Sequence, residues 1–424
     1  MKEIIKNIIL ENRHSDLPNF KKRNIIIPLH QNIIISLIGA RRSGKTYILY
    51  QLINKLLEEG INKNQILFIN FEDERLNLKS ENLDLILQAY QEITPEISLN
   101  NVYLFFDEIQ NITGWEKFVR RIYDTKTRNI FITGSNSKLL STEIATELRG
   151  RTLTYTIYPL NFKEYLSFNN VEPNLYPQKN KSKILYLQQK YMLDGAFPEI
   201  LNFDDFSKKR MLQQYFNVMI FRDIIERYNI SNVETLKFFI KKIFASITKP
   251  FSVNKAYNDL KSMGYTTSNK YLYEYFDYCN AVFLSQNINK FNFSEIKQEK
   301  SDKKAYIIDT GLICAVEFSI SQNFGKLFEN MVALELLKNE NQIYYFKNNY
   351  ECDFIVQNNN TFVPIQVCYT FEDSETKERE LRGLNEACQF LKTKTGTILT
   401  FDTEEELVYK DFDIKIIPFY KFFT

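Results

Sequence analysis

The chain has 424 residues and a formal net charge of +2, with 25% charged and 44% hydrophobic residues. This length gives room for about two to four domains, and the composition is that of a globular protein whose core needs no disulfide or metal. The near-neutral balance excludes a chain-wide basic field for nucleic acid. Only two histidines, His14 and His30, are present, which argues against His-ligated zinc and a Ser-His-Asp centre.

Compartment signals are weak but consistent with one another. The five cysteines include no C-x-x-C pair, which favours reduced thiols and a cytoplasmic location. The first residues carry charges where a secretory signal is apolar. The strongest apolar run, 33–40, contains a serine and a glycine and is too short to cross a bilayer. We therefore expect no membrane partner.

The first half of the chain alternates between two kinds of segment. Residues 1–30 are expected to form a short amphipathic helix and a connector. Apolar, β-branched bursts then alternate with helical-period segments over 31–165, a pattern that predicts an α/β domain with a parallel sheet covered on both faces. The expected strands are 33–38, 66–71, 102–106, 130–133 and 153–158.

The second half is predicted to contain three regions. Residues 166–230 are mostly helical and are expected to form a lid or linker. Residues 231–300 contain three helix candidates followed by a strand, an order that resembles a winged helix and would bring Lys255, Lys261 or Lys270 to DNA phosphates; a packing module without DNA contact remains the alternative. Strand and helix patterns alternate again in 301–424, which predicts an α/β domain.

A phosphate-binding motif follows the first predicted strand. The stretch from Gly39 to Thr46 matches G-x-x-x-x-G-K-[ST], in which glycines let the backbone turn around a phosphate that the next helix N-terminus then binds. We expect Lys45 to reach the β- and γ-phosphates of ATP and Thr46 to ligate Mg²⁺. The predicted nucleotide-binding residues are Gly39, Ala40, Arg41, Arg42, Ser43, Gly44, Lys45, Thr46 and Tyr47.

Two acids end the third predicted strand. Asp107 and Glu108 follow the apolar run 102–106, as an Mg²⁺ site and a hydrolytic water require. Asp107 is expected to hold Mg²⁺, and Glu108 to orient or deprotonate the attacking water. Solvated acids at an ordinary strand end are the alternative interpretation.

Further polar residues follow the fourth predicted strand. Asn136 or Ser135 is expected at the strand tip near the γ-phosphate, although an ordinary turn explains them as well. Arg149 and Arg151 come next, and a guanidinium stabilises transferring phosphate through spread charge and paired hydrogen bonds. Either arginine is a candidate to act on the nucleotide of a neighbouring copy; a salt-bridged helix end is the alternative.

Together these motifs resemble a known family. The segments 38–46, 69–76, 104–112, 133–140, 148–151 and 158–165 are similar to those of a prokaryotic AAA-type P-loop ATPase family. Its ATPase domain precedes a C-terminal domain of unknown function that is distantly similar to PD-(D/E)xK nucleases. The resemblance implies a five-stranded ATPase sheet, ATP hydrolysis with Mg²⁺, and by analogy a homo-oligomer.

The C-terminal part fits the nuclease frame incompletely. In such nucleases a helix Glu, a strand Asp and an acid two residues before a lysine bind Mg²⁺ and activate water. Glu329 and Asp353 match, but Gln366 replaces the second acid and Cys368 the lysine. An amide is a poor Mg²⁺ ligand, so we expect a nuclease-like fold without cleavage, retained for binding or assembly.

Three functions remain open from the sequence. The first is an ATP-hydrolysing switch or remodeller acting on DNA or on another protein. The second is an ATP-regulated DNA nuclease, which Gln366 and Cys368 disfavour. The third is a nucleotide-binding scaffold without hydrolysis, which the complete set of Lys45, Thr46 and the two acids disfavours.

Overall fold

The computed structural model describes residues 1–136, 148, 150–173, 178–316, 323–339, 341–358, 361–371 and 373–424. The chain divides into two compact units, Met1–Tyr158 and Pro159–Thr424. Within the ranges given, no helix has both the length and the apolar character needed to span a membrane.

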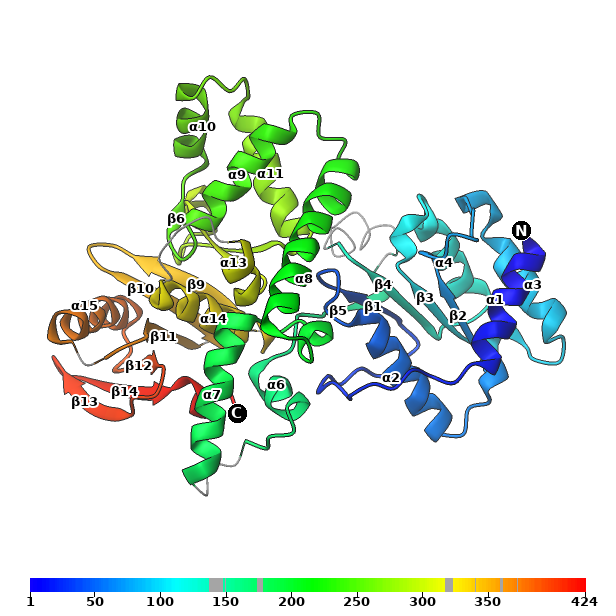
Figure 1. Ribbon diagram of the computed structural model, residues 1–424, viewed down its shortest axis with the longest axis horizontal. Helices are drawn as coiled ribbons and strands as arrows, with labels where there is room; N and C mark the ends of the chain where they lie inside the picture. Colours follow the sequence, from blue (N-terminus) through cyan, green and yellow to red (C-terminus); the bar gives the residue numbers. More distant parts are fainter. Residues whose placement is uncertain are drawn as a thin grey trace. The chain divides into compact units, whose positions relative to one another are not determined.

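The first unit is built on a five-stranded parallel sheet with the order β2-β3-β4-β1-β5 (Figure 1). All five strands lie close to the predicted ranges. The apolar sequences of β1, β2, β3 and β4 are wholly or mostly buried and form the centre of the unit, whereas β5, at the edge of the sheet, is partly exposed. The strands are β1 Ile34–Ile38, β2 Ile66–Asn70, β3 Tyr103–Asp107, β4 Ile130–Gly134 and β5 Thr152–Thr156. The predicted parallel α/β domain is confirmed.

Helices cover this sheet, and their apolar positions build its core. In one core cluster, Ile48 and Leu52 of the second helix pack with Leu37 of β1 and with the stacked rings of Phe105 and Phe131, whose centroids are 4.7 Å apart. The helices are α1 Lys2–His14, α2 Lys45–Glu58, α3 Asp84–Ile93 and α4 Trp115–Thr125. Helix α3, which packs against α1, was not predicted.

The second unit begins with helices. A π-helical segment, Met219–Glu226, continues α8. Three more helices and an antiparallel sheet of order β6-β8-β7 follow, close to the ranges predicted for the middle of the chain. The elements are α6 Phe162–Phe168, α7 Gln178–Asp194, α8 Asp205–Val218, α9 Val233–Ala245, β6 Pro250–Phe251, α10 Val253–Ser262, α11 Asn269–Ala281, β7 Ser285–Ile288, α12 Glu295–Lys300 and β8 Lys303–Ile307.

The C-terminal part of the second unit is a mixed six-stranded sheet of order β13-β14-β12-β11-β10-β9 with helices packed against it (Figure 1). Strands β9, β10 and β11 are antiparallel neighbours, whereas β11, β12 and β14 are parallel. The elements are α13 Thr310–Val316, α14 Phe324–Lys338, β9 Gln342–Lys347, β10 Glu351–Asn358, β11 Thr361–Cys368, α15 Ser374–Leu391, β12 Thr395–Thr400, β13 Glu405–Tyr409, β14 Phe412–Pro418 and α16 Phe419–Phe422. An α/β C-terminal domain is therefore confirmed.

Candidate functional site

The loop between β1 and α2 has the backbone geometry that its glycines allow. Gly44 has φ +98°, and Arg42, two residues earlier, also lies in the left-handed region with φ +68°. At Gly39, an added Cβ would lie 2.0 Å from the carbonyl oxygen of Ile157. A side chain at position 39 would therefore separate the loop from the segment that follows β5.

Lys45 begins α2 and is folded back into the loop. Its side chain is 3% exposed, and its Nζ donates to the carbonyl oxygens of Gly39 and Ala40 at 3.2 Å each. The same ammonium lies 3.3 Å from Oε1 of Glu108. Lys45 and Glu108 are thus in direct contact, which the sequence spacing alone did not predict.

Asp107 ends β3 and accepts hydrogen bonds from two other elements. Thr46 Oγ1 donates to its Oδ2 at 2.8 Å, and Thr133 Oγ1 of β4 donates to its Oδ1 at 2.6 Å. Burial and the adjacent Glu108 raise the pKa of Asp107 to about 6, against the two threonine hydrogen bonds and the charge of Lys45. Such a buried carboxylate is stabilised in its charged form by a cation.

Glu108 has an uncommon backbone conformation for a residue with a side chain. Its φ is +50°, and its amide donates to Thr133 Oγ1 at 2.8 Å. Burial acts to raise the pKa of Glu108, but Lys45, a hydrogen bond from Gln110 and the charge of Arg41 outweigh it and lower the pKa. Strained conformations of this kind persist where the surroundings fix them, often in functional sites.

Gln110 connects Glu108 with the tip of β4. Its Nε2 donates to Oε2 of Glu108 and lies 3.3 Å from Oγ of Ser135. Ser135 and Asn136 are both buried, 1% and 4% exposed, and Gln110 joins Ser135 to the same network as Glu108. Gln110 and Thr133 were not predicted, although each lies at the same carboxyl edge of the sheet.

Arg23 is a further residue that sequence analysis missed. It lies in the connector after α1, where its Nη1 donates to the carbonyl oxygen of Ser43 at 3.0 Å and its Nη2 to that of Tyr158 at 3.1 Å. The side chain of Gln51 in α2 bonds both the amide and the carbonyl of Arg23. The connector is therefore attached to the phosphate-binding loop by one arginine.

Arg41 and Tyr47, two other predicted loop residues, differ in their contacts. Arg41 Nη1 bonds Oε1 of Glu72 at 2.7 Å, so this arginine is held beside the end of β2. Tyr47 is 50% exposed and meets the ring of Tyr50 edge to face with centroids 5.8 Å apart. Arg41 therefore places a positive charge at the loop, and Tyr47 exposes its aromatic ring to solvent.

The arginine candidates lie away from this edge or outside the described residues. Arg149 is one of the residues that the structure does not describe. Arg151 pairs with Asp124 at 3.1 Å, and its guanidinium lies over Tyr123 at 5.8 Å. It precedes β5, whose start pairs with the start of β1, whereas the phosphate-binding loop follows the end of β1. The two edges are separated by about 16 Å of strand, so Arg151 does not reach the loop of its own chain.

The loop has polar groups that fit a bound nucleotide and a hard cation. Among the described residues, Ser43 Oγ and Gln110 Oε1 are buried and have no hydrogen-bond partner. Buried polar atoms of this kind are usually satisfied by a ligand or by water. Thr46 and Asp107 present hydroxyl and carboxylate oxygens, the ligands that Mg²⁺ prefers. The residues present therefore fit Mg²⁺ together with a nucleotide.

The second unit brings the C-terminal candidates together with partners that were not predicted. Glu329 of α14 and Asp353 of β10 both contact Nζ of Lys304, at 3.1 and 3.4 Å. The Oε1 of Gln366 accepts from the amide of Asp353 at 3.1 Å. Cys368 is buried in the core beside α15, and burial raises the pKa of its thiol to about 12, which agrees with a packing role.

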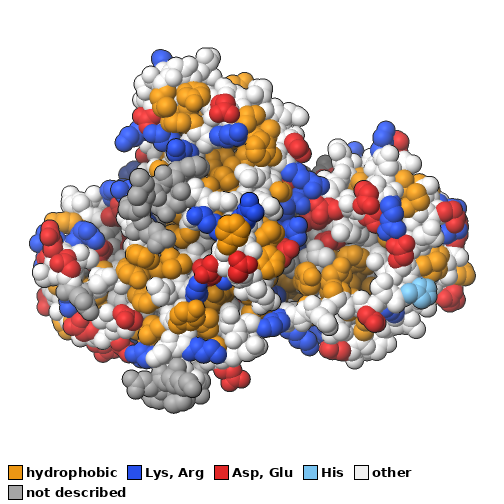
Figure 2. All heavy atoms as spheres, in the orientation of Figure 1, with side chains coloured by type: hydrophobic (Ala, Val, Ile, Leu, Met, Phe, Trp, Pro, Cys, Tyr) orange, Lys and Arg blue, Asp and Glu red, His pale blue; other side chains and the backbone are white. Residues whose placement is uncertain are grey.

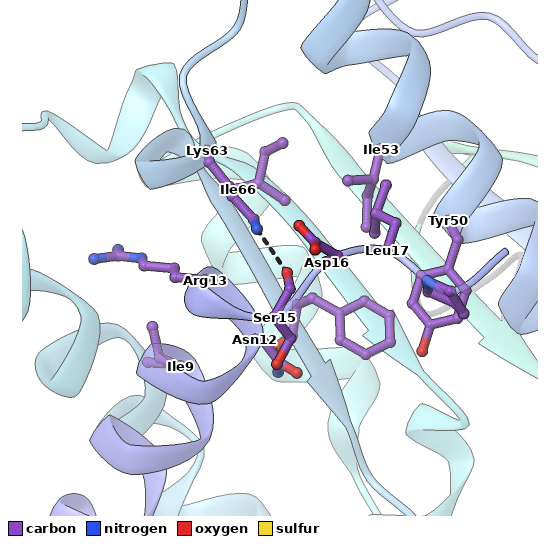
Figure 3. Close-up of a pocket in the computed structure, with 12 residues that line it drawn as sticks. Ile9, Asn12, Arg13, Ser15, Asp16, Leu17, Tyr50, Ile53, Lys63 and Ile66 are labelled. Atoms are coloured by element: carbon purple, nitrogen blue, oxygen red, sulfur yellow. Dashed lines mark hydrogen bonds between the residues drawn. The ribbon is translucent and has the colours of Figure 1, made fainter.

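A separate hollow of about 140 Å³ lies between the end of α1, α2 and β2 (Figure 3). Its lining includes none of the loop residues or strand acids. Lys63 Nζ donates to the carbonyl oxygen of Ser15 at 2.7 Å, and Asn12 Nδ2 to that of Phe68 at 3.1 Å. These polar side chains attach α1 and the connector to the sheet, so the hollow is distinct from the candidate site.

The fold and this loop define the class of the protein. Residues 31–166 match the model of an AAA domain, so the first unit is an AAA-type P-loop ATPase domain, a nucleotide-binding class. Residues 186–323 and 324–422 match two domains of unknown function, DUF8612 and DUF4143.

The chain belongs to the family of the uncharacterized protein MJ1544 of Methanocaldococcus jannaschii, with which it is 38% identical over 99% of this chain and 95% of the relative. An uncharacterized protein of Haemophilus influenzae is 30% identical over 79% of this chain and 82% of its own length. A second relative from Methanocaldococcus jannaschii, MJ1637, is 26% identical over 72% of this chain and 67% of the relative.

Solved structures with some likeness are distant. An McrB AAA+ hexamer of Thermococcus gammatolerans with bound McrC is 14% identical over 42% of this chain and 46% of its own, with a TM-score of 0.20. AMPPCP-bound DnaA of Aquifex aeolicus is 13% identical over 65% and 85%, with a TM-score of 0.25. ORC1 of Aeropyrum pernix in complex with DNA is 10% identical over 74% and 90%, with a TM-score of 0.30. The class rests on the domain match and the site.

Proposed function

We propose that this protein binds ATP with Mg²⁺ and hydrolyses it at the loop between β1 and α2. The observation that supports this most directly is the contact between the phosphate-binding loop and both strand acids: Thr46 with Asp107 at 2.8 Å and Lys45 with Glu108 at 3.3 Å. A binding protein without hydrolysis needs the lysine, but it does not need a buried glutamate beside it.

The residues have separate roles in this proposal. Lys45 binds phosphate oxygens once ATP is present, which requires it to exchange its contacts with the loop carbonyls and Glu108. Glu108 then loses its ionic partner and becomes free to accept a proton from water, while Gln110 keeps it oriented. Thr46 and Asp107 hold Mg²⁺, which neutralises phosphate charge when bound.

Measuring phosphate release by the full chain tests the proposal. Wild type is compared with Lys45→Ala and Glu108→Gln, and Glu81→Gln, an exposed glutamate of the same unit, is the control. We expect Glu108→Gln to bind a fluorescent ATP analogue normally and to lose turnover by about 100-fold or more. Lys45→Ala should lose binding as well. Equal turnover in all four proteins would reject hydrolysis at this site.

ATP hydrolysis is proposed to act as a switch for the rest of the chain. The connector that Arg23 attaches to the loop, and the polar network from Glu108 to Ser135, both contact the phosphate site, so a change at that site would be transmitted through them. The target of this switch is either DNA or another protein. A nucleotide-binding scaffold is the alternative, and normal ATP binding with no turnover in wild type would favour it.

Exposed lysines on the helical middle support DNA as the target. Lys255, Lys261 and Lys270 are exposed on α10 and α11, and Tyr271 beside them is 55% exposed. Figure 2 shows Lys and Arg side chains interspersed with hydrophobic and acidic ones over this part of the surface. We expect salt-dependent binding of duplex DNA that weakens when the three lysines are replaced by glutamate. A Kd that does not respond to salt would reject phosphate contacts.

A further inference from the structure

Lys304 is a lysine buried among carboxylates in the second unit. Its side chain is 0% exposed, and its Nζ lies 2.8 Å from Glu351, 3.1 Å from Glu329 and 3.4 Å from Asp353. Two of these acids are those that match the metal ligands of a nuclease frame. The ammonium therefore stands at the point where their oxygen atoms converge.

The lysine comes from outside the six-stranded sheet that carries Asp353. It lies on β8, the central strand of the sheet β6-β8-β7. Asn330 of α14 fixes this strand, because its side chain accepts from the amide of Ile307 and donates to its carbonyl, each at 2.8 Å. Tyr345 of β9 adds a hydrogen bond to the carbonyl of Asp302 at 2.6 Å. The position of Lys304 is thus set by backbone contacts on both sides.

Each of the three acids directs one oxygen to Lys304 and has a further partner besides it. Asp353 Oδ2 accepts from the amide of Val367 at 3.1 Å, and Glu351 Oε2 pairs with Lys347 at 2.9 Å. Tyr306 donates to Glu329 Oε1 at 2.8 Å, the oxygen that also contacts Lys304. In the described part of the chain, no group of three or more His, Cys, Asp or Glu side chains is arranged to hold a metal ion.

Gln366 is also fully engaged. Its Oε1 accepts from the amide of Asp353, and its Nε2 donates to Glu380. Glu380 in turn pairs with Arg379. The Gln366 side chain thus links the backbone of Asp353 to Glu380, and the charge of Glu380 is already neutralised by Arg379.

The charge state agrees with this geometry. Burial acts to lower the pKa of Lys304, but Glu329, Tyr306, Asp353 and Glu351 outweigh it and raise the pKa well above its ordinary value. The three acids within 3.4 Å of Nζ stabilise the ammonium form of this lysine. A divalent cation would have to displace this ammonium from the acids and leave it buried without a carboxylate partner. Leaving a buried charge without its partner is costly.

We propose that the ammonium of Lys304 is the resident cation of this acidic cluster, in place of Mg²⁺ or Mn²⁺. The residues present do not fit a catalytic metal. The cluster instead joins β8, and with it the sheet β6-β8-β7, to α14 and β10. This part of the chain then contributes assembly of the second unit and not metal-dependent cleavage of DNA.

Mn²⁺ binding to the nucleotide-free full chain tests the proposal. Bound Mn²⁺ is counted by electron paramagnetic resonance after EDTA treatment, in wild type, Asp353→Asn and Lys304→Met. We expect wild type and Asp353→Asn to bind equally little. Lys304→Met removes the cation and leaves three acids, so it should gain Mn²⁺, lose about 10 °C in Tm and regain about 5 °C when Mn²⁺ is added.

Lys338→Met is the matched control, since Lys338 is also buried but pairs with one carboxylate, Glu335, at 3.0 Å. It should lose stability without gaining Mn²⁺. A folded Lys304→Met protein that binds no more Mn²⁺ than wild type would overturn the proposal. If that variant does not fold, the comparison of wild type with Asp353→Asn decides: weaker Mn²⁺ binding, or Mn²⁺-dependent plasmid nicking lost on this change, overturns it.

Discussion

Thr46 Oγ1 donates a 2.8 Å hydrogen bond to Oδ2 of Asp107, which joins the start of α2 to the end of β3 across 61 residues. The other carboxylate oxygen accepts from Thr133 of β4. One buried aspartate thus connects three elements at the edge of the sheet where the phosphate-binding loop lies. This contact gives the first prediction.

Replacing Thr46 with valine removes the donor and leaves a buried acceptor without its partner. We expect a loss of about 1–3 kcal/mol in the free energy of unfolding and a loss of Mg²⁺-dependent ATP turnover. Thr46→Ser keeps the hydroxyl and should retain both. Urea unfolding and phosphate release measure the two effects, with exposed Thr125→Val as control. A Thr46→Val protein with wild-type turnover would contradict the assignment of Thr46 to Mg²⁺.

Gln110 is predicted to position Glu108. Replacing it with alanine removes the Nε2 donor to Glu108 and the contact with Ser135, so the glutamate gains alternative orientations. We expect kcat to fall about tenfold with little change in the Kd for ATP. Gln110→Asn retains an amide on a shorter side chain and should be intermediate. An effect on ATP binding with unchanged kcat would show that Gln110 acts elsewhere.

Arg23 is predicted to hold the phosphate-binding loop in place. Its guanidinium bonds the carbonyls of Ser43 and Tyr158 through two separate nitrogens of a planar fork, a geometry that the single nitrogen of a lysine does not reproduce. Arg23→Ala should therefore raise the KM for ATP and destabilise the first unit by about 2–3 kcal/mol. Arg23→Lys should restore only part of the KM and of the stability that Arg23→Ala loses. Arg75→Ala, at an arginine whose side chain is 43% exposed, is the control, and equal KM values in Arg23→Ala and Arg75→Ala would refute this role.

Arg151 is predicted to act only on a neighbouring copy, because it lies at the sheet edge opposite its own loop. Arg151→Ala and Lys45→Ala should each be inactive alone. Mixed together, they should regain turnover, since an intact loop in one copy then meets an intact arginine in the next. Arg128→Ala, at an arginine that also lies over the ring of Tyr123, is the control and should keep its activity. An active Arg151→Ala protein would exclude the residue.

Asp309 gives the stability of the second unit a dependence on pH. It accepts from the amides of Ala196 at 2.7 Å and Leu312 at 3.1 Å, yet burial raises its pKa to about 6. The native state therefore binds this proton more tightly than the unfolded chain, whose aspartate titrates near pH 4. Stability from this group falls as pH rises from about 4 to about 6, by at most about 3 kcal/mol.

Urea unfolding of the second unit at pH 4.5 and at pH 7 measures this dependence. The variant Asp309→Asn has no titrating group at this position, so its stability should change less between the two pH values than that of wild type. The variant is expected to be less stable than wild type at pH 4.5, because the side-chain nitrogen of Asn cannot accept from one of the two backbone amides, whereas both oxygens of a protonated aspartate can. Identical changes with pH in both proteins would assign the dependence to other groups.

Local chemistry determined most of the first unit. The glycines and the lysine of residues 39–46 lie close together in the sequence and specify a phosphate-binding turn. The apolar runs before this turn and before Asp107 specify buried strands. These signals depend on neighbours in the sequence, so the five strands and the AAA-type domain could be predicted from the chain alone. The C-terminal strands near Asp353 and Gln366 were predicted for the same reason.

The partners of these residues were decided by tertiary structure. Lys304 lies 49 residues before Asp353 and on a different sheet, and no periodicity or motif indicates that the two meet. Arg23 likewise contacts Tyr158 across 135 residues. A side chain's charge can be read from the sequence, but its burial, its partners and therefore its protonation follow from how distant segments pack. The same lysine would be an ordinary surface charge on an isolated β8.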